Sequence, residues 1–277
     1  MRVAFQGEPG AYSEQAVFNY FGEVETQPSE SFDAVFAEVA VGACEAGMIP
    51  IENSLAGSIH QNYDLLLRHD LHIVGEYLLR VQHCLIAHPG VTKAEIRKVI
   101  SHPQALGQCA AYLRGLGVKT ESAYDTAGSV KILKEWEERD TAAIASRRAA
   151  EIYGMQILEE GIEDNAENYT RFLAISQMAV NPAPGTAQGA GEAKTSIVFT
   201  LKNQPGSLFK CLSVFALRDI DLTKIESRPL QGKPWEYLFY IDFIGAAHEE
   251  TVRKALDHLS EYALMLRVLG SYARYKG

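Results

Sequence analysis

The stretch LHIVGEYLLRVQHCLIAH, from Leu71 to His88, decides how the N-terminal part of the chain folds. Its apolar residues predict extended structure, but polar residues interrupt its middle and it is longer than an ordinary strand. We therefore interpret it as a strand that crosses from one lobe to another. The chain can return through EEGIEDNAENYTRFLAIS, at 159–176. Two such crossings predict two lobes with a cleft between them.

Around the crossing, short runs of Val, Ile and Ala alternate with amphipathic stretches, which is typical of an α/β domain with a largely parallel sheet. The predicted strand–helix pairs are RVAFQG with YSEQAVFNYFG, AGMIPIEN with SLAGSIHQNYDLLLRH, KVISH with PQALGQCAAYLRGLG, VKTESAYD with TAGSVKILKEWEE, and TAAIAS with RRAAEIYG. We expect one α/β domain over 1–180, with one lobe at about 1–77 and 166–180 and the other at about 78–165.

A second, smaller domain is predicted after a linker. The segment NPAPGTAQGAGEA, at 181–193, has no large apolar residue and mixes Pro, Gly and Ala, so it can neither pack a core nor hold a regular element. Beyond it, 194–277 shows a βαββαβ order. That order predicts a ferredoxin-like sandwich.

Composition excludes several classes of function. The chain has 277 residues, 47% of them hydrophobic, which fits a globular protein with buried cores. A net charge of -9 argues against a nucleic-acid surface and an electrostatic membrane anchor. No apolar run reaches the length of a membrane-spanning helix, and MRVAFQGEPG lacks the features of a signal peptide. The four cysteines are far apart, so we expect isolated thiols and a cytoplasmic location.

Motifs for cofactors and metals are missing from the sequence. The GEPG loop at 7–10 follows a predicted strand but matches neither the dinucleotide fingerprint nor a P-loop. No G-x-S-x-G elbow occurs, and His69 and His72 have no third ligand nearby. We therefore expect no metal and no cofactor, and a cleft that takes a small anion.

Small polar residues stand where predicted strands end and helices begin. They are Ser13, Ser54, Ser101, Thr126 and Ser146, and Ser101 has capping-box spacing to Gln104. Helix N-termini carry unpaired N–H groups and partial positive charge, so several of them at one cleft would bind an anion. The alternative is that these residues are ordinary caps; only convergence at one sheet edge would be functional.

The segment ENYTRF, at 167–172, places polar side chains that can bind a substrate at the end of the predicted return crossing. Arg171 can clamp a carboxylate with two hydrogen bonds, and Thr170 beside it is a neutral donor and acceptor. The alternative is an ion pair between Arg171 and Glu163 or Asp164.

Two further strand ends carry groups that can move protons. In IPIENS, at 49–54, Glu52 could act as a base, and in SHPQ, at 101–104, His102 could act as an acid. The alternative is that both segments are turns.

In the second domain, NQPGSL at 203–208 and ESRP at 226–229 stand out. The first offers N–H groups to a carboxylate at a turn into a helix, and the second combines an acid, a hydroxyl and a cation. Together they could hold an amino acid, or they could be turn chemistry alone.

Taken together, AFQGEPGAYSE, IPIENS, SHPQALGQC, ENYTRF, NQPGSL and ESRP resemble the prephenate dehydratase family, in which an ACT regulatory domain follows the catalytic domain. The resemblance spans essentially the whole chain. It implies a two-lobed fold similar to type II periplasmic binding proteins, and cofactor-free conversion of prephenate to phenylpyruvate in phenylalanine biosynthesis. It also implies feedback inhibition by L-phenylalanine at an ACT dimer interface, in a homodimer or a dimer-of-dimers homotetramer.

The resemblance also assigns residues. The family's essential threonine falls on Thr170, and its other catalytic motifs fall on Glu52, Asn53, Ser54, His102, Gln104, Arg171 and Phe172. We expect Ser13, Ser101 and Thr126 to bind substrate. The expected phenylalanine site comprises Asn203, Gln204, Pro205, Gly206, Ser207, Leu208, Glu226, Ser227, Arg228 and Pro229.

The hypothesis is that helix N-termini and Arg171 bind the two substrate carboxylates and that Thr170 donates to the leaving hydroxyl. Glu52 or His102 would supply the proton, and the sequence does not decide between them. Two alternatives stay open at this point: an arogenate dehydratase, and a non-catalytic amino-acid or anion sensor with the same fold.

Overall fold

The computed structural model describes residues 1–180, 192–230, 232 and 236–275. They form two compact units, one of residues 1–69 and 77–172 and one of residues 70–76 and 173–277. The predicted linker at 181–193 lies almost wholly outside the described residues. Among the helices that the structure describes, none combines the length and apolarity needed to cross a membrane.

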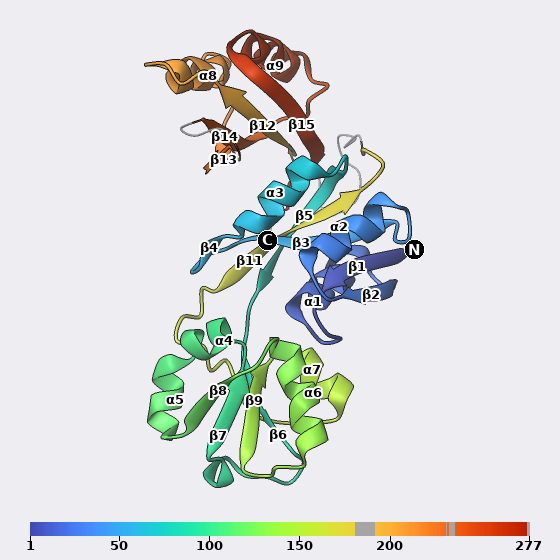
Figure 1. Ribbon diagram of the computed structural model, residues 1–277, viewed down its shortest axis with the longest axis vertical. Helices are drawn as coiled ribbons and strands as arrows, with labels where there is room; N and C mark the ends of the chain where they lie inside the picture. Colours follow the sequence, from blue (N-terminus) through green and yellow to red (C-terminus); the bar gives the residue numbers. More distant parts are fainter. Residues whose placement is uncertain (181–191, 231, 233–235, 276–277) are drawn as a thin grey trace. The chain divides into compact units, whose positions relative to one another are not determined.

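The first lobe is built on a sheet with the strand order β2-β1-β3-β11-β5, with β4 beside β3 (Figure 1). Its elements are β1 Arg2–Gln6, α1 Tyr12–Phe21, β2 Glu25–Ser29, α2 Phe32–Ala40, β3 Ala46–Asn53, β4 Gly57–Ser58, α3 His60–Arg68, β5 His72–Arg80 and β11 Tyr169–Ser176. Strand β1 pairs in parallel with β2 and β3. The apolar residues of β1 and β3 are almost fully buried, as expected of a parallel sheet covered on both faces.

The second lobe has its own sheet, in the order β10-β6-β9-β7-β8. Its elements are β6 Cys84–Ala87, the 3-10 turn η1 Lys93–Glu95, β7 Lys98–Ser101, α4 Pro103–Gln108, α5 Ala110–Leu116, β8 Lys119–Ser122, α6 Thr126–Trp136, β9 Thr141–Ala145, α7 Arg147–Tyr153 and β10 Gln156–Glu160. Strands β7, β8 and β9 are parallel, and β6 and β10 run antiparallel to their neighbours. An apolar core joins this sheet to α4 and α5.

The predicted crossing is confirmed, with a break in its middle. Strand β5 ends at Arg80 and β6 begins at Cys84, so 81–83 forms the connection between the two sheets. Here the outgoing and returning chains lie side by side, because the N–H of Val81 donates to the carbonyl of Asn168 at 2.7 Å. The polar interruption in the sequence therefore marks the passage between the lobes.

The C-terminal unit contains the predicted βαββαβ order. Its elements are β12 Ala193–Leu201, α8 Ser207–Ala216, β13 Leu222–Pro229, β14 Tyr237–Ile244, α9 Glu250–Tyr262 and β15 Ala263–Ala273. The sheet has the order β13-β14-β12-β15, with antiparallel neighbours, and its apolar core lies between the sheet and the two helices. The ferredoxin-like prediction is confirmed.

The beginning of β5 belongs to this second unit and is tied to it by a buried ion pair. The ammonium of Lys194 lies 2.8 and 3.1 Å from the two carboxylate oxygens of Glu76, and both side chains are buried. The N–H of Tyr275 donates to the same carboxylate at 3.1 Å. A Cβ added at Gly270 would lie 2.0 Å from the carbonyl oxygen of Ile73, so only glycine fits there. The charges and the close backbone contact hold 70–76 within the C-terminal unit.

Candidate active site

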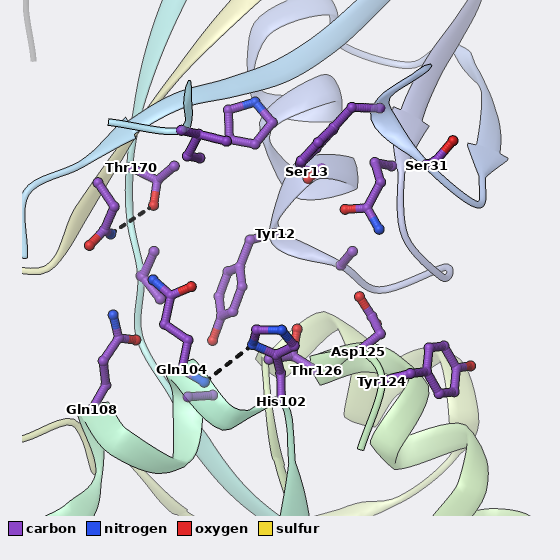
Figure 2. Close-up of a pocket in the computed structure, with 18 of the residues that line it drawn as sticks. Tyr12, Ser13, Ser31, His102, Gln104, Gln108, Tyr124, Asp125, Thr126 and Thr170 are labelled. Carbon is purple, nitrogen blue, oxygen red and sulfur yellow. Dashed lines mark hydrogen bonds between the residues drawn. The ribbon is translucent and has the colours of Figure 1, made fainter. Parts of the chain in front are cut away.

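A pocket of about 530 Å³ lies in the first unit and takes its walls from both lobes (Figure 2). Its size is in the range of small-molecule sites. Its polar lining residues are Gln6, Tyr12, Ser13, Glu30, Ser31, Asn53, Gln61, His83, His102, Gln104, Gln108, Tyr124, Asp125, Thr126 and Thr170. Among the described residues that line it, none is Lys or Arg.

Four helices begin at this pocket, two from each lobe. The first residues of α1 and α2 line it from the first lobe, and the first residues of α4 and α6 line it from the second. Each of these helices follows a strand, so the strand ends aim the helix N-termini at one space. The helix dipoles direct partial positive charge into that space, which the carboxyl groups of Glu30 and Asp125 also line. Of the five residues predicted to converge, Ser13 and Thr126 lie at this pocket, and Ser54, Ser101 and Ser146 do not.

The residues predicted to cap or line helix N-termini differ in their roles. Ser146 does cap α7, accepting from the N–H of Ala149 at 3.0 Å, but it lies outside the pocket lining. Helix α6 is capped by Asp125, not by Thr126, and α4 by the imidazole of His102. Each cap is thus one residue from the predicted one, and Thr126 stands as the first residue of its helix.

Ser101 has another role than capping. Its hydroxyl is fully buried and donates to the carbonyl of Ile144 at 2.6 Å, so it joins β7 to β9 and does not line the pocket. Ser13 is no cap either: it lies inside α1 and lines the pocket. Ser54 joins β3 to β11, because its backbone and hydroxyl bond to Tyr169 and Glu167.

Thr170 lies on the pocket wall, and its hydroxyl is oriented by Asn53. The Oδ1 atom of Asn53 accepts from the N–H groups of Leu55 and Ala56, at 3.1 and 2.9 Å. This fixes the amide, so its Nδ2 donates to Oγ1 of Thr170 at 3.0 Å (Figure 2). The threonine oxygen is then an acceptor toward Asn53, and its own proton is available for another group.

Arg171 and Glu52 face away from the pocket. Successive residues of a strand point to opposite faces, so Arg171 and Thr170 are separated, as are Glu52 and Asn53. The guanidinium of Arg171 is buried and lies 3.5 Å from the carboxylate of Glu52. The hypothesis that Arg171 clamps a substrate carboxylate is not supported by this position. The alternative pairing with Glu163 or Asp164 is not found either.

Glu163 and Asp164 have partners of their own. Glu163 accepts from the N–H of His83, and Asp164 accepts from the N–H of Ala111 at the start of α5. Phe172 is buried in β11 and lies outside the pocket lining.

His102 and Gln104 line the pocket from the second lobe, as expected of the SHPQ segment. The Nδ1 atom of His102 accepts from the N–H of Gln104 at 3.2 Å, which places the proton of the neutral imidazole on Nε2. Beside them, burial raises the pKa of Asp125, and the nearby carboxylate of Glu8 acts in the same direction. His102 thus lines the pocket and can exchange a proton there, whereas Glu52 lies outside the pocket lining.

Sequence reasoning missed a cluster at the connection between the lobes. The imidazole of His83 lies 2.9 Å from the hydroxyl of Tyr12 through Nδ1 and 2.9 Å from the amide oxygen of Gln108 through Nε2. All three residues line the pocket. The only hint in the sequence is that His83 interrupts the apolar run at 71–88.

Several hydrogen bonds and an ion pair join the two lobes near the pocket. The carboxylate of Glu8 accepts from the hydroxyl of Tyr124 at 2.9 Å and pairs with Lys131 at 3.2 Å. Ser146 donates to the carbonyl of Gly10 at 2.6 Å. These contacts hold the two lobes together around the space where the helices begin.

The residues expected to bind phenylalanine lie on two elements of the C-terminal unit. The segment 203–208 forms the turn into α8, where Gly206 has a φ of 80° and precedes the first helical residue. The segment 226–229 ends β13, an edge strand. Gln204 and Ser207 line a hollow of about 340 Å³ with Lys202 and Lys210.

Comparison with known proteins identifies the family. The family model described as Prephenate dehydratase matches residues 3–179, and the model described as ACT domain matches residues 195–260. "Arogenate dehydratase/prephenate dehydratase 2, chloroplastic" from Arabidopsis thaliana is 50% identical over 98% of this chain and 72% of its own length.

Two solved structures are similar over nearly the whole chain. The prephenate dehydratase from Arthrobacter aurescens in complex with L-Phe is 31% identical, with a TM-score of 0.89 over 99% of this chain and 90% of that one. A protein described as "GqqA- a novel type of quorum quenching acylases" is 36% identical, with a TM-score of 0.91 over 99% of this chain and 98% of that one. With the family match over both parts of the chain, these likenesses show that this protein is a dehydratase, a lyase of the prephenate dehydratase family that carries an ACT domain.

Proposed function

We propose that this enzyme converts prephenate to phenylpyruvate, water and carbon dioxide. The observation that carries the proposal is the meeting of four helix N-termini with Thr170 in one pocket, whose lining has no Lys or Arg among the residues that the structure describes. Prephenate carries two carboxylates and a ring hydroxyl. Helix N-termini suit the carboxylates, because they bind anions without a cationic side chain. The reaction makes the ring aromatic and therefore needs no cofactor.

In the reaction, the bond between the ring and its carboxylate breaks, and its electron pair moves into the ring as carbon dioxide leaves. The pair expelled at the opposite ring carbon departs with the hydroxyl, which needs a proton. Thr170 donates a hydrogen bond to that oxygen as charge develops, because Asn53 already occupies the acceptor side of the threonine. His102 is the better placed of the two proposed proton donors, since it lines the pocket and Glu52 does not.

Arogenate is the second candidate substrate. It differs from prephenate in bearing an amino group where prephenate has its side-chain ketone. Two carboxyl groups, of Glu30 and Asp125, line the pocket, and either could pair with an ammonium. The Arabidopsis relative carries both activities in its name.

The deciding experiment measures turnover of both substrates by purified protein, reading out phenylpyruvate and phenylalanine. We expect a higher kcat/KM for prephenate. A higher kcat/KM for arogenate would reassign the substrate, and no turnover of either would contradict the proposed function.

We further propose that L-phenylalanine inhibits the enzyme by binding to the ACT domain, in a dimer or a dimer of dimers. The Arthrobacter aurescens structure is a complex with L-Phe, and this chain has the same two domains in the same order. A ligand shifts activity only through different affinities for two states. Replacing Glu226, Ser227 and Arg228 by alanine should abolish inhibition and leave basal turnover intact. Unchanged inhibition would place the effector elsewhere, and light scattering with and without phenylalanine would test the assembly.

A further inference from the structure

We propose that His83 is a positioning residue that turns the NH₂ group of the Gln108 carboxamide toward the substrate. This inference rests on the proposed function, since it assigns a donor for an anionic substrate in the same pocket. His83 comes from the connection between the lobes, Tyr12 from the start of α1, and Gln108 from the end of α4. The imidazole of His83, in the connection between the lobes, thus contacts one residue of each lobe.

The hydrogen-bond inventory fixes the tautomer. The amide oxygen of Gln108 has no proton, so Nε2 of His83, 2.9 Å away, must donate to it. The hydroxyl of Tyr12 has a single proton and lies 2.9 Å from Nδ1 and 2.8 Å from the carbonyl of Gln82, so these two acceptors share it in a three-centre hydrogen bond. Burial lowers the pKa of His83, while the hydrogen bond to Gln108 and the Glu163 carboxylate act in the opposite direction. Burial is the largest of these effects and favours the neutral ring with one proton. That proton is on Nε2.

The hydrogen bond from His83 sets the orientation of the Gln108 side-chain amide. With its oxygen held by His83, the amide presents its two N–H donors to the remaining space, and Gln108 lines the pocket. Figure 2 shows its side chain extending from the helix, below Thr170 as drawn, with Gln104 between it and Tyr12 in this view. In a pocket without Lys or Arg among its described lining residues, such donors complement the helix N-termini in binding a carboxylate.

Two substitutions separate positioning from mere packing. In His83→Gln the side-chain amide can reach the place of Nε2 and donate to Gln108, whereas in His83→Asn it can reach only the place of Nδ1. We expect His83→Asn to raise KM about 10- to 100-fold, the range for a hydrogen bond to a charged group, with kcat within about threefold. His83→Gln should restore KM to near the wild-type value.

The matched control is His88, a half-buried histidine of the second lobe whose Nε2 lies 2.9 Å from the carbonyl of Leu133. His88→Asn and His88→Gln should leave KM unchanged. If His83→Asn does not fold, Gln108→Leu serves instead, with the same expected rise in KM. If it folds, His83→Asn combined with Gln108→Leu should raise KM no further than either change alone.

A measurement without substrate keeps the inference separate from the proposed function. In protein with ¹⁵N-labelled histidine, the signals of His83, assigned by their loss in His83→Gln, should show Nε2 protonated and Nδ1 free at neutral pH. A proton on Nδ1, or a wild-type KM in His83→Asn, would overturn the inference. Wild-type protein that turns over neither substrate but shows the expected tautomer would instead contradict the proposed function alone.

Discussion

Replacing Thr170 by valine tests the leaving-group step, because valine keeps the shape of threonine and removes only the hydroxyl. The loss to folding is small: Nδ2 of Asn53 keeps the oxygen of Asn168 at 2.7 Å and the carbonyl of Tyr169 at 3.2 Å. One hydrogen bond of this kind is worth about 1 kcal/mol. The loss to catalysis is larger, since removing a preorganised donor to a developing oxyanion costs about 3 kcal/mol, or roughly 100-fold in kcat.

The assay follows phenylpyruvate formation from prephenate at saturating substrate, and arogenate is tested in parallel. Thr170→Ser keeps a hydroxyl and should retain most of the turnover. The control is Thr141→Val, which removes the hydroxyl of a buried threonine in β9 that is bonded to Glu138 at 3.0 Å. We expect this control to leave kcat unchanged. A Thr170→Val enzyme with kcat within about threefold of wild type would refute the assigned role of the threonine.

Three other predictions concern stability. Gly10 has a φ of 91°, and an added Cβ would lie 2.6 Å from a backbone atom of the facing lobe, so Gly10→Ala should lower both Tm and kcat/KM. The control is Gly22→Ala, at a φ of 76° with nothing within 4 Å of an added Cβ, which should lower Tm less and leave kcat/KM unchanged. Glu76→Gln should cost about 3–5 kcal/mol in urea unfolding, because it leaves Lys194 charged and buried, and adding Lys194→Met should recover most of the loss; equal stability of the single variant and wild type would contradict the role of this ion pair. The folded-state pKa of His83 is lowered by burial, so the unfolded chain binds more protons as pH falls below about 6.5, the ordinary value. Its contribution to stability is therefore present above that pH and is lost below it, and His83→Gln should flatten the dependence of unfolding free energy on pH between about 5 and 7.

The sequence predicted the architecture because its strongest patterns are long ones. The break in the run at 71–88 marked the passage between lobes, and the βαββαβ order of the C-terminal part was plain from alternating apolar runs. Strand β2, ETQPS, was not predicted, because its polar residues and proline lack the apolar pattern of a strand. It lies at the edge of the sheet, beside β1. The helix expected after β7 divides at Cys109, whose φ of -114° and ψ of 22° leave the helical region.

The site was predicted by its motifs but not by its geometry. Thr170, Asn53, His102 and Gln104 line the pocket, and Arg171 does not. Strand β11 is buried on both faces, so its sequence shows no alternation that could have told which face Thr170 takes. The cluster around His83 joins residues from three distant elements, and such contacts become visible only when the chain is folded. The domain bounds at 181–193 and the individual catalytic roles remain predictions.

The division of β5 between the two units bears on how this protein can be cut. A chain ending at residue 180 would keep the buried carboxylate of Glu76 and lose the ammonium of Lys194, while a fragment beginning at residue 194 would do the reverse. Each fragment would therefore have to expose to water, or neutralise, the charged side chain that is buried and paired in the intact chain. The unit that contains the ACT domain thus includes buried residues from the N-terminal part of the sequence, and exchanging this domain with that of a relative would require exchanging 70–76 along with it.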